Sequence, residues 1–531
     1  MTGRSAIFKG SHYSGAVSLT EQVAVSSQNS TADSATTTPN RYATDLSWSS
    51  VLVLLWCIAI LAHFDDNLHF NHSQSKTYAH INLWATAFCF LGLFFARNRY
   101  LVMAILVLHI SAVWNAMPVT DNHWWMSWFI SCALLFGLLY QTARGRCRNA
   151  PLEDDSLNQV IPAIRWIVIF LYFFAVFHKL NSDFFDPNRT CAIHFYNRAR
   201  ANLPFWPFPD RPGEHLRYFL IGATLLLEGA PAIFLSIRRT WFLGIFFGAV
   251  FHLTTGLYMR HFPTIMLCIY FLFVPKDFSR QVLTTIDQSI RKLSRNSFGL
   301  VRVLQAQALF WTFWCFQINF HRRYFLRRGS DWSDYIYDYH TMLRVWFVVM
   351  LATAIVLLMI FFRYKGWRYF EKQWLFTRWW PLYALPMLFF FNGASPYLGL
   401  NGHPTMAMWS NLDVAGGHSN HLVIPAGALT VFPYTDDIVT ILGTSPQDGA
   451  WRNQYVKGNS RIPFSMLKRK ILHLKSKGRT DIYLRYERAG KQYDLRQAEM
   501  DPEFAQPEPY WFKKLIHIKD PPKGNRGVCR S

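Results

Sequence analysis

The chain has 531 residues, of which 51% are hydrophobic, 17% aromatic and only 16% charged. A soluble protein of this length would form two or more domains, but long apolar runs recur between residues 48 and 391. A helix must stay apolar for about 20 residues to cross the hydrocarbon of a bilayer. The composition therefore argues against a soluble multidomain protein and predicts an all-α polytopic membrane protein.

The charge balance is strongly basic, with 54 Lys and Arg against 32 Asp and Glu. On a soluble protein this excess would raise the question of a nucleic-acid partner. About half of it lies in 451–531, where a solvated basic surface is the simplest explanation and lipid headgroups or an acidic substrate are alternatives. No nucleic-acid motif accompanies the charge, so we expect no nucleic-acid partner.

The eight cysteines include no C-x-x-C pair, so we predict neither a metal site nor dithiol redox chemistry. Most lie in apolar runs, where cysteine packs as a small hydrophobic residue. Only Cys191 and Cys529 could meet in an oxidising compartment, and the sequence leaves that bridge open.

The chain divides into four parts. Residues 1–46 are rich in Ser, Thr and Ala and predict a disordered N-terminal segment. A transmembrane core over 47–280 and additional helices and loops over 281–391 give about 9–11 transmembrane helices. The apolar segments are 48–64, 81–96, 100–117, 124–140, 162–178, 217–237, 241–259, 262–275, 300–320, 341–362 and 379–391.

The basic residues between these segments predict an orientation. With a cytoplasmic N-terminus, the inner loops, including 276–299 and 363–378, carry more Lys and Arg than the outer loops, as the positive-inside rule requires. The segment 300–320 either crosses against this bias or lies along the interface, because Arg322, Arg323, Arg327 and Arg328 follow it.

The pattern after residue 391 changes to short strands. NHLVIPAGALTVFPY and IVTILG predict strands, and DIYLRYERAGKQYDL predicts a hairpin around Ala489-Gly490. Residues 464–475 have helical spacing. We therefore predict a small mixed, mainly β, extracytoplasmic domain over 392–531.

Ionisable residues in or beside apolar segments are functional candidates, because charge at membrane depth is costly. Lys179 directly follows an apolar run, where it could supply a neutral amine as a base or simply anchor the helix end. Asp183, four residues later, could be its ion partner. Glu228 lies within an apolar run and must be protonated, paired or facing a wet cavity.

Two histidines are further candidates. Asn122-His123 lies in the short outer turn TDNHWW, where it could contact a substrate or only anchor the interface. His252 lies in the middle of an apolar helix, where it could contact a substrate or bond to a neighbouring helix.

Together these positions resemble the vitamin K-dependent gamma-carboxylase family and the wider HTTM (horizontally transferred transmembrane) domain proteins. The Lys-Leu-x-x-Asp-aromatic signature of that family stands here at 179–184, and its Asn-His-aromatic-Trp turn at 122–125. Phe251-His252 precedes a short Phe-rich helix, and Glu228 follows a leucine run. The segment FNGASPYLGLNGHPTMAMWSNL, which follows the membrane region, also matches.

The resemblance implies an enzyme in which a reduced quinone and oxygen generate a strong base. That base removes a glutamyl γ proton, and carbon dioxide then adds. Carried onto this chain, the family roles make Lys179 the residue that deprotonates reduced vitamin K or a related hydroquinone, assisted by His123. Asn122, His252, Glu228 and Asp183 would line the substrate and cofactor site. The partners would be the lipid bilayer, the quinone and a glutamate-containing peptide or protein.

The chain departs from the family in its C-terminal part. The carboxylases carry a large outer domain that holds the peptide, whereas only 140 residues follow residue 391 here. A membrane enzyme with a lipid-soluble redox cofactor is therefore a better interpretation than glutamyl carboxylation itself. The alternative is a non-catalytic transporter or an assembly or scaffold protein, although we find no internal repeat of the kind that transporters show.

Overall fold

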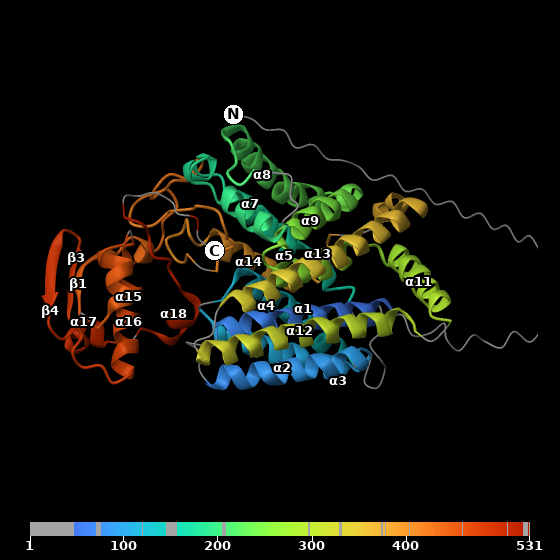
Figure 1. The fold of residues 1–531 in the computed structure, drawn as a ribbon, viewed down its shortest axis with the longest axis horizontal. Helices are drawn as coiled ribbons and strands as arrows, with labels where there is room; N and C mark the ends of the chain where they lie inside the picture. Colours follow the sequence, from blue (N-terminus) through green and yellow to red (C-terminus); the bar gives the residue numbers. More distant parts are fainter. Residues whose placement is uncertain are drawn as a thin grey trace, which may run out of the picture. The chain divides into compact units, whose positions relative to one another are not determined.

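A computed structural model describes most of the chain after residue 46. The described residues are 47–70, 76–118, 120–144, 157–203, 209–295, 298–328, 332–372, 375–376, 379–402, 404–445, 447–458, 460–506, 508–523 and 529. The predicted disordered segment 1–46 lies outside them. Helices dominate the described chain, and a small antiparallel sheet lies near the C-terminus (Figure 1).

Every apolar segment predicted from the sequence falls on a helix, as expected for long apolar runs. The helices are α1 (Trp48–Phe70), α2 (Lys76–Phe94), α3 (Arg99–Ala116), α4 (Asn122–Ala143), α5 (Ile161–Phe177), α8 (Glu214–Ser236), α9 (Trp241–Thr255), α10 (His261–Tyr270), α12 (Leu300–Arg328), α13 (Trp332–Arg363) and α14 (Ala384–Ala394).

Four of the described helices are long and apolar enough to cross a bilayer. They are Arg99–Ala116, Asn122–Ala143, Glu214–Ser236 and His340–Arg363. The pair His261–Phe273 and Lys276–Leu293, which is bent by 119°, would be a fifth span if it counts as one. Trp48–Ala62, His80–Phe94 and Ile161–Phe177 are apolar but shorter. These helices are compatible with an integral membrane protein.

Two connections predicted as loops contain helices. The connection between α5 and α8 contains α6 (Ser182–Phe185) and α7 (Cys191–Asn202), and the connection 276–299 contains α11 (Lys276–Leu293). α11 buries Phe278, Val282 and Leu283 and exposes polar residues on its other face. The loop prediction was wrong because an amphipathic helix has no continuous apolar run, and its signal is periodicity.

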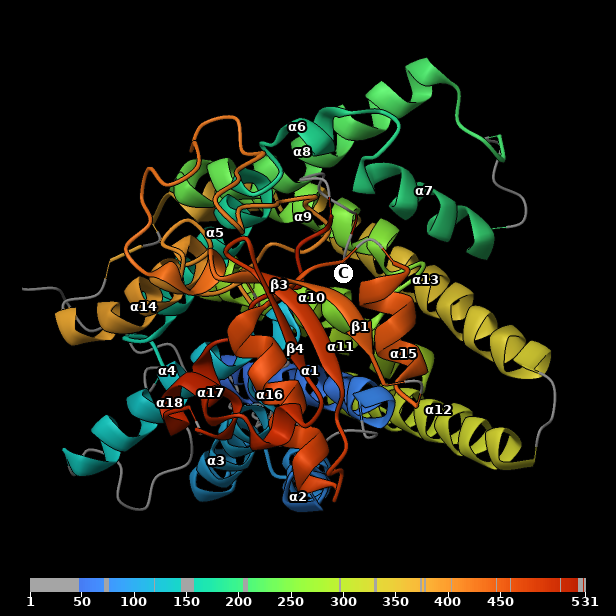
Figure 2. The same ribbon diagram turned by 90° about the vertical axis from the view of Figure 1, so that its left-hand side faces the viewer.

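The C-terminal part contains a four-stranded sheet with the order β2-β1-β3-β4, antiparallel throughout. Figures 1 and 2 show it at one end of the helices, with α16 against it. Its elements are β1 (Ile438–Thr444), β2 (Ile462–Pro463), β3 (Leu484–Arg488), β4 (Lys491–Leu495), α15 (Gly449–Trp451), α16 (Phe464–Ser476), α17 (Pro502–Ala505) and α18 (Tyr510–Leu515). The short 3-10 and π segments are Arg238–Thr240, Phe271–Phe273, Gly366–Lys372, Trp380–Tyr383, Pro433–Thr435, Arg452–Val456 and Ala498–Met500.

Three of the four local predictions in this region are confirmed. IVTILG forms β1, 464–475 lies in α16, and β3 and β4 form the predicted hairpin. Its two turn residues, Ala489 and Gly490, adopt φ values of 49° and 75°, as a two-residue hairpin turn of the primed type requires.

The predicted strand NHLVIPAGALTVFPY was wrong. Residues 420–434, all of which the structure describes, form an irregular loop that ends in a short 3-10 turn. Pro425 and Pro433 lack the backbone N–H that a sheet ladder needs, and Gly427 adopts a φ of 74°. These residues break an apolar segment whose composition favours a strand.

The largest apolar core of the described chain lies among the helices, and the second largest includes the sheet and α16. A disulfide joins Cys191, at the first residue of α7, to Cys529 near the chain end. This is the bridge that the sequence left open.

Candidate functional site

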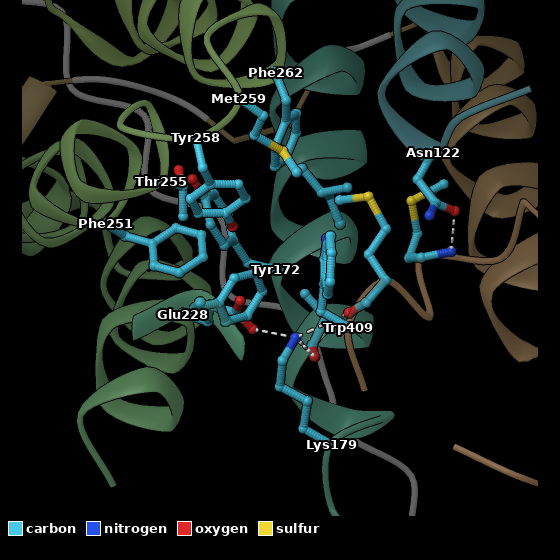
Figure 3. A pocket seen from close by; sticks show the side chains of 15 residues that line it. Asn122, Tyr172, Lys179, Glu228, Phe251, Thr255, Tyr258, Met259, Phe262 and Trp409 are labelled. Atoms are coloured by element: carbon cyan, nitrogen blue, oxygen red, sulfur yellow. Dashed lines mark hydrogen bonds and ion pairs between the residues drawn. The ribbon is translucent and has the colours of Figure 1, made fainter. Parts of the chain in front are cut away.

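A small pocket lies among α5, α7, α8 and α9, close to where α5 ends (Figure 3). One side is closed by residues 404–411, an irregular segment after α14 that we call the strap. The lining is almost entirely apolar apart from one ion pair and a few hydroxyl and amide groups. It comprises Asn122, Leu171, Tyr172, Ala175, Lys179, Phe195, Glu228, Phe251, Thr255, Tyr258, Met259, Phe262, Met406, Met408 and Trp409.

Lys179 and Glu228 form a buried ion pair in this pocket. Lys179 Nζ lies 2.7 Å from Glu228 Oε2, and the two side chains are only 2% and 6% exposed. The same ammonium donates to the carbonyl oxygens of Ala175, at 3.1 Å, and Met408, at 3.3 Å. The ammonium thus has a carboxylate beside it and two carbonyl oxygens as acceptors. Lys179 therefore points into the protein and does not extend toward lipid headgroups.

The expected ion pair between Lys179 and Asp183 was wrong. Asp183 Oδ1 accepts from Arg189 Nη1 at 2.9 Å, and Asp183 Oδ2 accepts from Asn420 Nδ2 at 2.8 Å. α5 ends at Phe177, so the residue four positions after Lys179 no longer lies one helical turn above it. Among the described residues, Asp183 is not part of the pocket lining.

Polar side chains just after α5 hold the strap through its backbone. His178 Nε2 donates to the Thr405 carbonyl at 2.9 Å, and Asn181 Nδ2 donates to the Ser410 carbonyl at 2.5 Å. His178 Nδ1 accepts from the Tyr397 hydroxyl at 2.8 Å. A ring that donates from one nitrogen and accepts at the other is neutral.

The strap is strained, and Asn122 holds it from the opposite side. Met406, Trp409 and Asn411 have φ values of 62°, 52° and 57°, a conformation that residues other than glycine rarely adopt. The Asn122 side-chain oxygen accepts from the Met406 backbone N–H at 2.7 Å. Strain of this kind persists where surrounding contacts enforce it, and it is common at functional sites.

His252 lies behind the pocket wall in a buried chain of hydrogen bonds. Its Nε2 lies 2.5 Å from the hydroxyl of Tyr172, which lines the pocket and also bonds to the Tyr270 hydroxyl. His252 Nδ1 has no hydrogen-bond partner among the described residues. Gly248 makes room for this chain, because a Cβ there would overlap the Tyr270 hydroxyl oxygen.

His123 lies one side chain away from the pocket. Its ring packs against His261 at 4.9 Å and against Phe262 at 5.7 Å between ring centroids. Phe262 lines the pocket, whereas His123 is not in the described lining. His123 therefore does not line the cavity directly.

The structure brings Lys179, Glu228 and Asn122 to one pocket, places His252 and His123 directly behind it, and separates Asp183 from it. Sequence reasoning missed Tyr172, which lies in α5 seven residues before Lys179. It also missed Met408 and Trp409, which only the folded strap brings to the site.

In the part of the chain that the structure describes, no group of three His, Cys, Asp or Glu residues could hold a metal ion. Comparison with protein-family models, with curated proteins and with solved structures found no match.

Proposed function

We propose that the chain is a multi-pass membrane enzyme that binds a reduced, lipid-soluble quinone at the Lys179–Glu228 pocket, resembling vitamin K-dependent gamma-carboxylase. With oxygen, such a cofactor supplies a strong base when bound. The observation that carries the proposal is a charged pair, almost completely buried, in a cavity that is otherwise apolar. Perturbed ionisable groups in apolar clefts are typical of reactive sites.

The residues of the pocket fit a hydroquinone. Phe195, Phe251, Phe262 and Trp409 offer apolar and aromatic surface for a flat ring. Met259, Met406 and Met408 are flexible, so the small cavity can widen around a ligand. The ion pair offers a carboxylate acceptor and a neighbouring positive charge to a hydroxyl group, and a pocket for a hydrocarbon would need neither.

The ion pair can accept a proton from a bound hydroxyl group in two ways, and in both the positive charge that the pair gains offsets the negative charge left on the hydroxyl oxygen. While Lys179 is an ammonium, the Glu228 carboxylate is the acceptor and Lys179 stabilises the negative charge that develops on a bound hydroxyl. After one proton moves from Nζ to Glu228, Lys179 is a neutral amine and can itself accept a proton. The Tyr172 hydroxyl, which bonds to His252 and Tyr270, is a further polar group at the pocket wall.

We further propose that the N-terminus is cytoplasmic and that 392–531 is extracytoplasmic, with the shorter apolar helices also crossing to give about 9–11 spans. Basic residues in the inner connections support this orientation. The Cys191–Cys529 disulfide supports it as well, because such bonds persist in oxidising compartments. The site then lies near the outer ends of the helices.

The test is quinol-dependent oxygen consumption by the purified protein in lipid nanodiscs, measured with an oxygen electrode against autoxidation. We expect Lys179→Ala and the double variant Lys179→Met/Glu228→Gln to lose this activity. The double variant removes both charges and so avoids leaving one buried and unpaired. Lys477→Met, a change at an exposed lysine of the C-terminal domain, is the control and should retain activity. Equal rates in wild type and Lys179→Ala would reject the proposal.

Glutamyl carboxylation is the narrower form of the proposal. It predicts that a glutamate-containing peptide incubated with the protein, reduced vitamin K and labelled bicarbonate acquires label, and that Lys179→Ala abolishes this. If several peptides remain unlabelled while oxygen is still consumed, the quinol-dependent enzyme stands and the substrate is not glutamyl.

A further inference from the structure

An uncharged, exposed loop lies beside the last turn of α5. The sequence contains no Asp, Glu, Lys or Arg between Asp413 and Asp436. Within this stretch, Leu422, Val423, Leu429 and Val431 are 61%, 63%, 50% and 69% exposed. We call residues 422–432 the apolar loop. Single exposed hydrophobic residues are ordinary, but a group of them without any charge marks a surface that contacts another apolar phase.

The base of the apolar loop is fixed to the helical region. The Leu422 N–H donates to the Leu180 carbonyl at 2.8 Å, just after α5. The N–H groups of Val431 and Phe432 donate to the Leu398 carbonyl, just after α14, at 3.1 and 3.0 Å. Gly399 packs so tightly beneath the loop that a Cβ there would overlap the Phe432 carbonyl oxygen. The chain therefore presents these apolar side chains in a defined place.

The apolar loop continues a surface formed by α5 and α14. On α14, Leu388 and Phe391 are both 56% exposed. Phe173 of α5 packs against Phe390, with ring centroids 6.3 Å apart, and stacks on Phe177 at 5.4 Å. Phe177 then packs on His421 at 4.7 Å, directly before the loop. Aromatic contacts thus connect the outward face of two apolar helices to the loop without an intervening charged residue.

We propose that the apolar loop inserts into the lipid surface next to the ends of α5 and α14. Apolar helix faces of a membrane protein contact lipid, and a loop continuous with them would meet the same phase near the headgroups. This placement explains why an uncharged, Pro- and Gly-containing loop is exposed and not folded into the neighbouring sheet. The proposal requires that the protein is embedded in a membrane, but it does not depend on any reaction in the pocket.

The test is a nitroxide spin label on an introduced cysteine, in full-length protein in lipid nanodiscs. Labels at Val423→Cys and Val431→Cys report on the loop, and Leu388→Cys on α14 is the lipid-facing reference. Met500→Cys, at a residue 66% exposed in the C-terminal region, is the water-facing reference. Collision rates with oxygen, which concentrates in lipid, and with a water-soluble nickel chelate are compared. Unmodified protein treated with the same label gives the background from the native cysteines.

We expect both loop labels to show an oxygen-to-nickel collision ratio several-fold above that of Met500→Cys and approaching that of Leu388→Cys. A ratio equal to that of Met500→Cys would place the loop in water and overturn the proposal. Low collision rates with both reagents would place the loop in a protein contact, which overturns it as well. Because the labels replace single exposed side chains, they should not disturb folding.

Discussion

Two ion pairs, one in the helical region and one in the C-terminal region, differ in how far they are exposed to solvent. Lys179 and Glu228 meet at 2.7 Å with side chains 2% and 6% exposed. In the C-terminal domain Arg488 bonds to Asp437 at 2.7 Å and to Glu503 at 2.5 Å, with all three side chains partly open to solvent. The distances are alike, and the surroundings are not.

This difference separates a pair that stabilises from a pair that needs another explanation. A solvent-exposed pair contributes about 1 kcal/mol or less, but it costs little to place. A buried pair loses the hydration of both charges, and hydrophobic residues of similar size are often equally stable in its place. Stability therefore accounts for Arg488 and does not account for Lys179 and Glu228, which favours a chemical role for them.

The strongest test of this difference between the two ion pairs is to remove one charge from each. Glu228→Ala leaves a buried ammonium without its carboxylate, and we expect a loss of about 3–5 kcal/mol in the free energy of unfolding. Arg488→Met should cost about 1 kcal/mol. Both values can be measured by chemical unfolding in detergent micelles.

The control for this prediction is the double variant Lys179→Met/Glu228→Gln, which should recover most of the stability that Glu228→Ala loses. If Glu228→Ala and Arg488→Met lower the free energy of unfolding by the same amount, the Lys179–Glu228 pair is open to solvent, contrary to the burial that the structure shows.

The two regions also differ in the reason why a glycine is needed. Gly248 is needed for space beside Tyr270, whereas Gly490 has open space around it and is needed for its φ of 75°. We expect Gly248→Ala to cost about 1–3 kcal/mol through overpacking, and Gly490→Ala about 1 kcal/mol through backbone strain. Thermal unfolding of the purified variants would measure both effects.

Gly222 provides the matched control, because it lies in an apolar helix and a Cβ added there would have no neighbour within 4 Å. Alanine is a better helix former than glycine, so Gly222→Ala should be neutral or slightly stabilising. A loss at Gly222 as large as at Gly248 would show that the crowding at Tyr270 is not what matters.

Local patterns predicted much of this fold. Apolar runs predicted the helices well, because both their length and the spacing of their apolar residues fit a helix. The hairpin at Ala489-Gly490 was predicted from its turn residues, which adopt positive φ. α11 was missed because its apolar residues are spaced and not continuous. The apolar loop was mistaken for a strand because composition alone does not show whether an apolar segment packs into a sheet or lies exposed at the surface.

The candidate site could be predicted only in part, because its residues come together over long sequence separations. Lys179 and Glu228 were both recognised as costly charges, but spacing suggested Asp183 as the partner of Lys179. The real partner lies on a different helix, and no local periodicity connects α5 to α8. Trp409 reaches the pocket only because His178 and Asn181 fix the strap, which is a tertiary arrangement.

The smallest expected effect concerns pH and again compares the two regions. Burial, helped by the positive charges of Arg469, Lys519 and Lys470, lowers the pKa of His517 to about 4, against about 6.5 in an unfolded chain. Between these values the unfolded state binds more protons than the folded state, so stability falls as pH falls from about 6.5 to about 4. His517→Asn removes this contribution, and thermal unfolding at pH 7 and pH 4.5 should show a smaller loss than in wild type.

The difference should be about 1 kcal/mol, because the ring is partly exposed and solvent screens the full effect of its pKa shift. His178→Asn is the comparison variant in the helical region. Its ring is completely buried and bonded at both nitrogens, so we expect the substitution to lower stability at both pH values. If His517→Asn and wild type lose the same stability between pH 7 and pH 4.5, the histidine of the C-terminal domain titrates like an exposed one. His517 would then contribute nothing to the pH dependence of stability.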